Sequence, residues 1–300
     1  MKKKTYLFAL MAMALTLGSC SDNENGIGGE TSKYITVSTS IGNMTRVATD
    51  ANGGQTFEEG DEISVYAWIG APTVAPETRE RVVNNAINKL TNGSWVSTPQ
   101  MLWKNNRDKH YFIGVYPTAA ISDLSAGEYT FDVNKQTESD LLVAVNKDGI
   151  SYNADEQQTV PLTFTHVMAK LAVNLTYKNQ WGGIPTVEKV VVGNAAKEAT
   201  INYLTKVVTP STTAKEDFSL PEITENTKYV SVIIPQEDVK QLTIVIGGKN
   251  FVYDNGTPFK LESGKITTVN LEVGRDEIKL GDVKITNWED GSTFSGEALN

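Results

Sequence analysis

The feature that most constrains the fold is a two-residue alternation of apolar and polar side chains, in short runs separated by turn residues. Successive side chains of a strand point to opposite sides, so this alternation is typical of strands with one buried face. Turn pairs between the runs, such as Asn92-Gly93 and Gly247-Gly248, suit hairpins. The pattern predicts an all-β fold with strands at 35–41, 63–68, 110–116, 141–145, 167–175, 187–192, 229–234, 242–246, 251–253, 266–273 and 278–285.

Two segments also carry helical spacing. Apolar residues in 76–90 recur near every 3.6 positions, as on one face of a helix, whereas 164–175 fits both periods. Because 164–175 is β-branched and alternates more regularly than it turns, we interpret it as a strand. No repeat of 20–50 residues is visible, which argues against solenoids and propellers.

The chain length sets an expectation for domain number. A chain of 300 residues suggests about two domains, and many short strands with turns suggest β-sandwiches. The polar stretch Asn146–Thr159 is the best boundary. We therefore expect an N-terminal sandwich at 34–155 and a C-terminal sandwich at 156–300.

Composition excludes several classes of function. The chain has 36 acidic and 27 basic residues, a net charge of −9, whereas binding to nucleic acid or anionic membrane needs clustered Lys and Arg. One cysteine and two histidines rule out a disulfide scaffold and a zinc site built from several Cys and His side chains.

The first 19 residues form a candidate signal peptide. Three lysines at positions 2–4 precede the apolar stretch Tyr6–Leu17, which is shorter than the ~20 residues of a membrane-spanning helix. The following Leu17-Gly18-Ser19-Cys20 resembles the lipobox of bacterial lipoproteins, which implies lipidation, such as palmitate, on Cys20. The alternative is an ordinary secretory signal followed by an incidental cysteine.

An acidic, Gly-rich linker is expected at 20–33. Asp22 and Glu24 are similar to the surface-export signals of Bacteroidales-type lipoproteins, although an ordinary solvated linker has the same composition.

Several segments, in one order along the chain, resemble the fimbrillin family, the Mfa-like pilus subunits of Bacteroidales-type bacteria. They are 44–47 (MTRV), 57–66 (FEEGDEISVY), Trp103 with 110–117 (HYFIGVYP), 140–142 (DLL), 162–171 (LTFTHVMAKL), 233–236 (IIPQ), 261–274 (LESGKITTVNLEVG) and 285–288 (ITNW). The resemblance implies two tandem transthyretin-like β-sandwich domains. It also implies a lipoprotein precursor that a trypsin-like surface protease cuts after an arginine, and assembly in which a donor strand from the next subunit fills the vacated groove.

The residues that match this mechanism at the N-terminus are Arg46 and Val47, the expected cleavage pair. Val47 departs from the alanine common in the family, but trypsin-like cleavage depends chiefly on the residue before the bond. Cleavage would free the alternating segment Lys33–Ile41 as a removable strand. The alternative is that Arg46 is one more exposed loop cation.

A donor strand is expected at 278–288, where Ile278/Leu280 and Val283/Ile285 alternate around a Gly281-Asp282 break. The same pattern also fits an edge strand that stays with its own sandwich.

Residues for catalysis are scarce. His166 could act as a base but suits a core position, and we expect His110 at an exposed cross-strand position. The carboxylates of 58–62 could form a glycosidase site or a calcium site, but a solvated loop is the simpler interpretation. The five tryptophans could stack on sugars, but we expect each of them to be buried in the core or at its rim. They are Trp68, Trp95, Trp103, Trp181 and Trp288.

We therefore predict a surface-exposed lipoprotein of the outer membrane that becomes a structural or adhesive fimbrial subunit, not an enzyme, with no cofactor or metal. Its expected partners are other fimbrial subunits, a trypsin-like surface protease and, through the lipid, the outer membrane. The alternative is a surface glycan-binding lipoprotein that does not polymerise, and a hydrolase is a more distant third.

Overall fold

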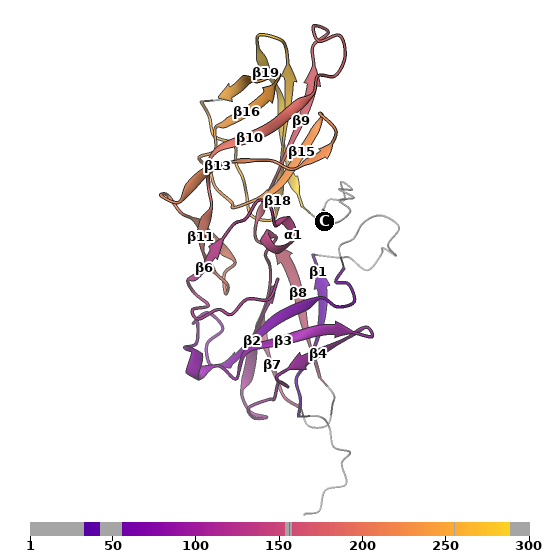
Figure 1. Ribbon diagram of the computed structural model, residues 1–300. Coiled ribbons are helices and arrows are strands. Elements are labelled where there is room, and N and C mark those ends of the chain that lie inside the picture. The colour runs from indigo at the N-terminus through magenta and orange to yellow at the C-terminus, as the bar shows by residue number, and fades with distance from the viewer. Residues whose placement is uncertain (1–32, 43–55, 154–155, 157, 255, 289–300) are drawn as a thin grey trace, which may run out of the picture.

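The computed structural model describes residues 33–42, 56–153, 156, 158–254 and 256–288. Two lobes lie end to end, with the indigo and purple strands of the first half in one lobe and most of the orange and yellow strands in the other (Figure 1). Almost all regular structure is β, so the all-β prediction is confirmed. Among the described residues, no helix has the length and apolar content that crossing a bilayer requires.

The first lobe contains a seven-stranded sheet in the order β1-β8-β7-β5-β2-β3-β4. Its first and last strands lie near each other, since β1 and β4 are in contact although neither pairs with the other. The sheet therefore curves around a core. Its strands are β1 (Thr36–Ile41), β2 (Glu62–Ile69), β3 (Val83–Thr91), β4 (Ser94–Thr98), β5 (Lys109–Tyr116), β7 (Leu142–Ser151) and β8 (Thr159–His166).

Three further sheets complete the molecule. A five-stranded sheet has the order β14-β15-β9-β18-β19, in which β18 runs parallel to β9 and antiparallel to β19. Its strands are β9 (Ala169–Tyr177), β14 (Glu222–Thr224), β15 (Lys228–Ile233), β18 (Lys265–Val273) and β19 (Ile278–Asn287). A four-stranded sheet contains β10 (Val187–Ala196), β13 (Lys215–Ser219), β16 (Gln241–Ile246) and β17 (Lys249–Asp254). A three-stranded sheet contains β6 (Gly127–Thr130), β11 (Glu198–Asn202) and β12 (Val207–Pro210).

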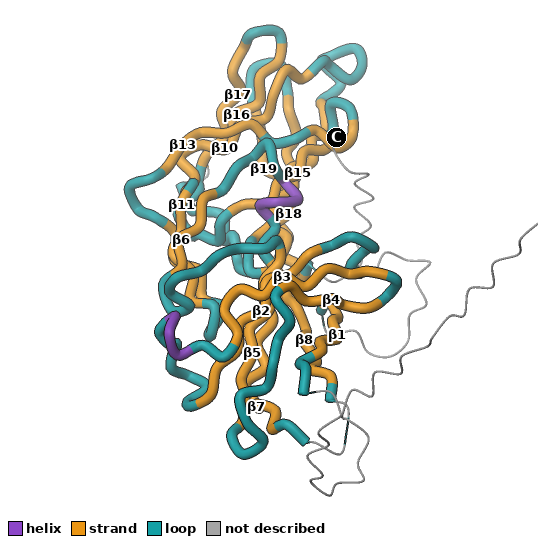
Figure 2. The backbone as a smooth tube through the Cα atoms, turned by 60° about the horizontal axis from the view of Figure 1, so that its bottom comes forward, coloured by secondary structure: helices purple, strands orange, loops and turns teal. Residues whose placement is uncertain are grey.

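The two halves of the chain interlock between the lobes. Strand β8 pairs with β1 and β7 of the first lobe, and β9 begins in the five-stranded sheet only three residues after His166. Strand β6 of the first half pairs with β11 of the second half, as the tube in Figure 2 shows. The predicted domain boundary near residue 155 lies before β8, whereas the chain passes from one sheet to the other after β8. The division into two domains stays a prediction.

Two groups of buried side chains form the core. One fills the curved sheet of the first lobe and contains Ile35, Val65 and Phe112. The other runs from the opposite face of this sheet, at Tyr66 and Ile113, through the three-stranded sheet into the second lobe. Because this second core is continuous, apolar burial joins the lobes.

The segment 76–90, whose spacing suited a helix, forms a short 3₁₀ turn η1 (Thr78–Glu80) followed by strand β3. The spacing arises from a β-bulge. Asn85 has a φ of 56°, and Asn84 and Asn85 lie opposite the single residue Tyr66. The extra residue shifts the alternation by one position, so the inward side chains do not follow a strict period of two.

The helix α1 (Gln136–Ser139) connects the lobes. The Gln136 side-chain oxygen accepts the backbone N–H of Val232 at 2.7 Å, and its amide nitrogen donates to Ser231 Oγ at 3.1 Å. The Gln136 side chain thereby provides a hydrogen-bond partner for a backbone N–H of β15, at a point along this strand that the short neighbouring strand β14 does not reach.

Candidate functional site

The strand β1 closes the curved sheet along one edge. It pairs in parallel with β8, from Thr36 opposite Thr159 to Ile41 opposite Phe164, and the Gly42 N–H donates to the Phe164 carbonyl at 2.8 Å. Within the described residues, β8 has no other strand partner over 159–163. Loss of β1 would therefore leave a row of unpaired backbone groups.

The start of this segment is also held from its other side. The Ile35 N–H donates to the Met101 carbonyl at 2.9 Å, and the Trp103 N–H donates to the Lys33 carbonyl at 3.2 Å. The segment 33–41 is thus inserted between two stretches of backbone.

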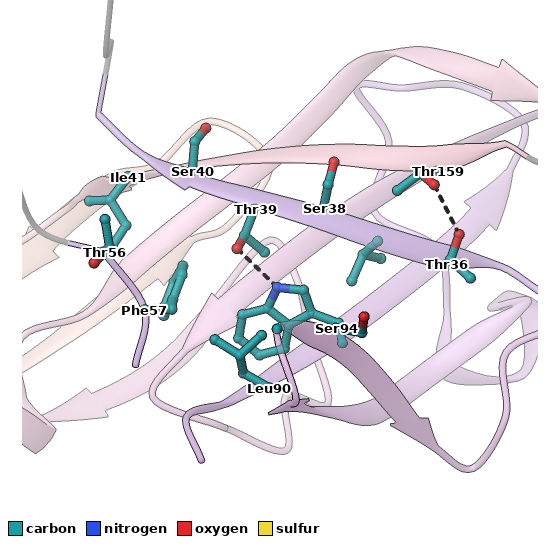
Figure 3. Close-up of a pocket in the computed structure, with 13 residues that line it drawn as sticks. Thr36, Ser38, Thr39, Ser40, Ile41, Thr56, Phe57, Leu90, Ser94 and Thr159 are labelled. Atoms are coloured by element: carbon teal, nitrogen blue, oxygen red, sulfur yellow. Dashed lines mark hydrogen bonds between the residues drawn. The ribbon is translucent and has the colours of Figure 1, made fainter. Parts of the chain in front are cut away.

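The side chains of β1 alternate as the sequence predicts. Ile35 and Val37 are 2% and 6% exposed and lie in the core of the curved sheet, whereas Ser38 and Ser40 point away from it (Figure 3). Thr39 also faces inward, where its Oγ1 accepts the indole N–H of Trp95 at 3.0 Å. Burial of Ile35 and Val37 stabilises the docked strand by about 1.5–3 kcal/mol each.

A groove of about 620 Å³ lies between β1 and the β3–β4 hairpin. Phe57 forms its centre, and the Phe57 ring lies 5.4, 5.3 and 5.1 Å from the rings of Trp95, Tyr116 and Phe164. Leu90 completes the apolar floor (Figure 3). Phe57 is the second residue after the gap 43–55 in the described chain, so this aromatic cluster holds the chain in the lobe from that point on.

The ring of Phe164 requires a glycine beneath it. A Cβ added to Gly114 on β5 would lie 2.6 Å from Phe164 Cζ, closer than non-bonded atoms approach. Gly114 therefore lets the Phe164 ring lie across β5, in the core of the curved sheet against Phe57.

Together these features define a strand-shaped slot. One wall offers backbone partners along β8, the floor is aromatic, and the inward pockets accept alternate apolar side chains. This geometry binds an extended segment by backbone hydrogen bonds and side-chain burial together.

The donor-strand candidates lie on β19, the edge strand of the five-stranded sheet. Ile278 and Leu280 are half-buried against the core, and Val283 and Ile285 are 39% and 38% exposed. The Gly281-Asp282 break predicted from sequence is a β-bulge, because both residues lie opposite Asn270. The strand is continuous through the bulge, so the resident position that the sequence left open is occupied in this structure.

The histidines are both buried. His166 Nδ1 lies 2.8 Å from Asp140 Oδ1, as expected for a satisfied core side chain. The expectation of an exposed His110 is wrong: it is 0% exposed, its Nε2 accepts the Lys104 N–H at 3.1 Å, and its ring packs edge-on to Trp103. Trp103 lies in the same core and shields the start of β5, which the alternation along one strand does not reveal.

The acidic turn 58–62 is a structural loop. The Asp61 carboxylate accepts the Glu58 N–H at 2.7 Å, Glu59 accepts backbone N–H groups of the β3–β4 turn, and Glu62 pairs with Lys89 at 3.0 Å. Over the described ranges, no group of three or more His, Cys, Asp or Glu side chains could hold a metal ion.

The tryptophans do not form a platform on one face. Trp68, Trp103 and Trp288 are at least nine-tenths buried. Trp95 lies in the groove floor, and Trp181 packs edge-on to Phe251 in the other lobe.

Several predicted sites lie outside the described residues. They are the signal peptide 1–19, the lipidation residue Cys20 with most of the linker, and the cleavage pair Arg46 and Val47. The described chain stops at Gly42 beside β8 and resumes at Thr56 beside the groove, so both ends of 43–55 adjoin the slot.

Sequence reasoning identified the strand of the slot but missed its floor. Phe57, Trp95 and Phe164 come from three distant segments, and no periodicity connects them. The one available signal was Phe164, which we placed in a single strand over 164–175. That expectation is wrong, because the segment divides between β8, which ends at His166, and β9, which begins at Ala169 in another sheet.

Comparison with known proteins gives a family match. The family model described as fimbrillin-like matches residues 45–288. A search of curated protein sequences finds no match to this chain.

Solved structures share the fold at low sequence identity. A candidate cell adhesion protein from Bacteroides ovatus aligns with a TM-score of 0.62 and 17% identity, over 85% of this chain and 98% of that one. A second from Bacteroides uniformis has a TM-score of 0.61 and 19% identity, over 81% and 100%. A fimbrial protein from Bacteroides vulgatus has a TM-score of 0.52 and 13% identity, over 84% and 99%. These likenesses establish the fold.

The first prediction concerns the inward side chains of β1. Ile35→Ala should lower the free energy of unfolding in urea by about 2–5 kcal/mol, because it leaves a cavity in the core. Ser38→Ala, on the outward face of the same strand, should change it by no more than about 0.5 kcal/mol. Equal losses in the two variants would contradict the slot.

The second prediction concerns pH. Burial lowers the pKa of His110, against the opposing effect of its hydrogen bond to the Asp108 carbonyl. As the pH falls below about 6.5, the imidazole of His110 therefore becomes protonated in the unfolded chain before it does in the folded chain. The free energy of unfolding decreases as the pH falls. His110→Gln, whose amide oxygen can still accept the Lys104 N–H, should lose less unfolding free energy between pH 7.5 and 5.5 than the wild-type chain. An identical loss in both would contradict this role.

Proposed function

Because the chain belongs to the fimbrillin-like family, we propose that it is the precursor of a fimbrial subunit that assembles by strand exchange after proteolysis at Arg46. The family resemblance seen in the ordered sequence segments is confirmed by the match over residues 45–288. The observation that carries the mechanism is the position of β1, an edge strand that fills an apolar slot and comes before Arg46 in the chain.

Cleavage after Arg46 would sever the only covalent link between β1 and the rest of the lobe. The freed segment would then be held by its backbone pairs with β8 and 101–103 and by Ile35 and Val37. Once it leaves, the open slot offers the same hydrogen bonds and pockets to a strand of another subunit.

The donor strand would be β19, through Ile278, Leu280, Val283 and Ile285. Like Ile35 and Val37 of the segment 33–41, these residues carry apolar side chains two positions apart. As an edge strand with exposed apolar side chains, β19 can leave its sheet at lower cost than an interior strand.

The function is structural or adhesive, not enzymatic. Both histidines, the groups most suited to acid–base catalysis near neutral pH, are buried in structural contacts. The sandwich domains are transthyretin-like, and the lipid on Cys20 holds the precursor at the outer membrane until the protease releases it into the fimbrium.

The third prediction tests the cleavage. Trypsin treatment of the purified chain should produce a ladder of high-mass species on unheated SDS gels that collapses on boiling, because exchanged strands are held without covalent bonds. Arg46→Ala should remove the ladder, and Arg46→Lys, which trypsin still cuts, should retain it. A ladder from the Arg46→Ala chain would overturn cleavage at this site.

The fourth prediction tests the anchor. Cells grown with radiolabelled palmitate should label the wild-type chain and not the Cys20→Ala variant, since the thiol is the acceptor. The variant should also leave the membrane fraction. Equal labelling of both would rule out lipidation at Cys20.

A further inference from the structure

The C-terminal half of β19 is held by few side chains. Over 283–287, every residue is exposed or half-exposed, and apart from contacts to β17 the strand pairs only with β18. Backbone ladder bonds alone hold an edge strand weakly. The residue that follows, Trp288, is 7% exposed and is therefore the buried anchor of this end.

Trp288 binds where the two lobes meet. Its indole stacks on the imidazole of His166 with ring centroids 4.0 Å apart and planes within 6°. On β9, the Lys170 ammonium lies 4.1 Å from the centroid of the indole ring. The backbone N–H of Trp288 donates to the Gly264 carbonyl at 3.1 Å. The backbone and the ring of Trp288 are therefore both fixed.

The site that receives the indole is itself ordered by both lobes. Asp140, which precedes β7, fixes the imidazole through its contact with Nδ1 at 2.8 Å. Lys170 is half-buried, and burial lowers the pKa of its ammonium against the opposing effect of the Asp140 carboxylate. In its protonated form the half-buried ammonium is attracted to the aromatic face more strongly than a fully hydrated one. The anchor therefore ties the C-terminal strand to the first lobe as well as to its own sheet.

One group in this site is left unsatisfied. The indole Nε1–H of Trp288 is buried and has no hydrogen-bond acceptor among the described residues. A buried donor without a partner opposes the stabilisation that ring burial provides. The resident position thus combines ring stacking and a cation–π contact with an indole N–H that no described residue accepts.

We propose that Trp288 is a latch that holds β19 on its own subunit and that its departure from the His166–Lys170 site frees the strand for donation. That the released strand is donated to another subunit rests on the proposed function. That Trp288 holds β19 on its own subunit does not. Leaving the site removes the cost of the unpaired indole N–H, because a solvated indole can donate to water. The latch sets how readily β19 is released.

The test is amide hydrogen exchange on the full chain, read over 283–287. Trp288→Ala should accelerate exchange there at least about tenfold, because the end of the strand loses its buried anchor. Trp288→Phe keeps an aromatic ring against His166 but buries less surface, so exchange should be slower than in Trp288→Ala. Lys284→Ala, an exposed position on the same strand and outside the donor-candidate side chains, should stay within about threefold.

Two results would overturn the latch. One is exchange over 283–287 in Trp288→Ala within threefold of the wild-type chain. The other applies if Trp288→Ala loses protection throughout the molecule, in which case Trp288→Phe decides: exchange over 283–287 as fast as in Trp288→Ala would exclude the latch, and slower exchange there would support it.

The ladder assay separates this proposal from the proposed function. After trypsin, Trp288→Ala should form the ladder faster than the wild-type chain. Faster exchange with no ladder from any variant would support the anchor and contradict strand donation, whereas a ladder with unchanged exchange would support donation and contradict the latch.

Discussion

The structure of the first lobe depends on one constraint: a curved sheet with a free edge must cover both its unpaired backbone and its apolar interior. Strand β1 meets both needs, by pairing with β8 and by inserting Ile35 and Val37. The covering strand is contributed by the chain segment before residue 43. Under the proposed cleavage at Arg46 this segment would lose its covalent link to the lobe, and the precursor and the assembled subunit would then differ in which strand covers the edge.

The other end of the chain shows the complementary arrangement. Strand β19 is an edge strand with exposed apolar side chains and a bulge at Gly281-Asp282, and the last residue that the structure describes, Trp288, is buried. The anchor site includes His166 at the end of β8, and residues 159–164 of that strand pair with β1. The same strand therefore borders both the slot and the site that holds the donor candidate.

The sequence predicts most core strands, because their inward side chains repeat every two residues, as in β1 and β18. It misses β3, where the bulge at Asn85 displaces the alternation, and short polar strands such as β14, which bury no side chain. The pairing of β6 with β11 and the burial of His110 under Trp103 come from contacts between distant segments, which no local pattern encodes.

The central claim is that removal of β1 creates a slot for a strand of another subunit. Binding of a fluorescent peptide of residues 277–288 to the chain before and after cleavage at Arg46 tests it most directly. We expect saturable binding to the cleaved chain after the freed N-terminal segment is removed, and none to the intact chain or with a scrambled peptide. Equal binding to cleaved and intact chains, or binding to neither, would contradict the account.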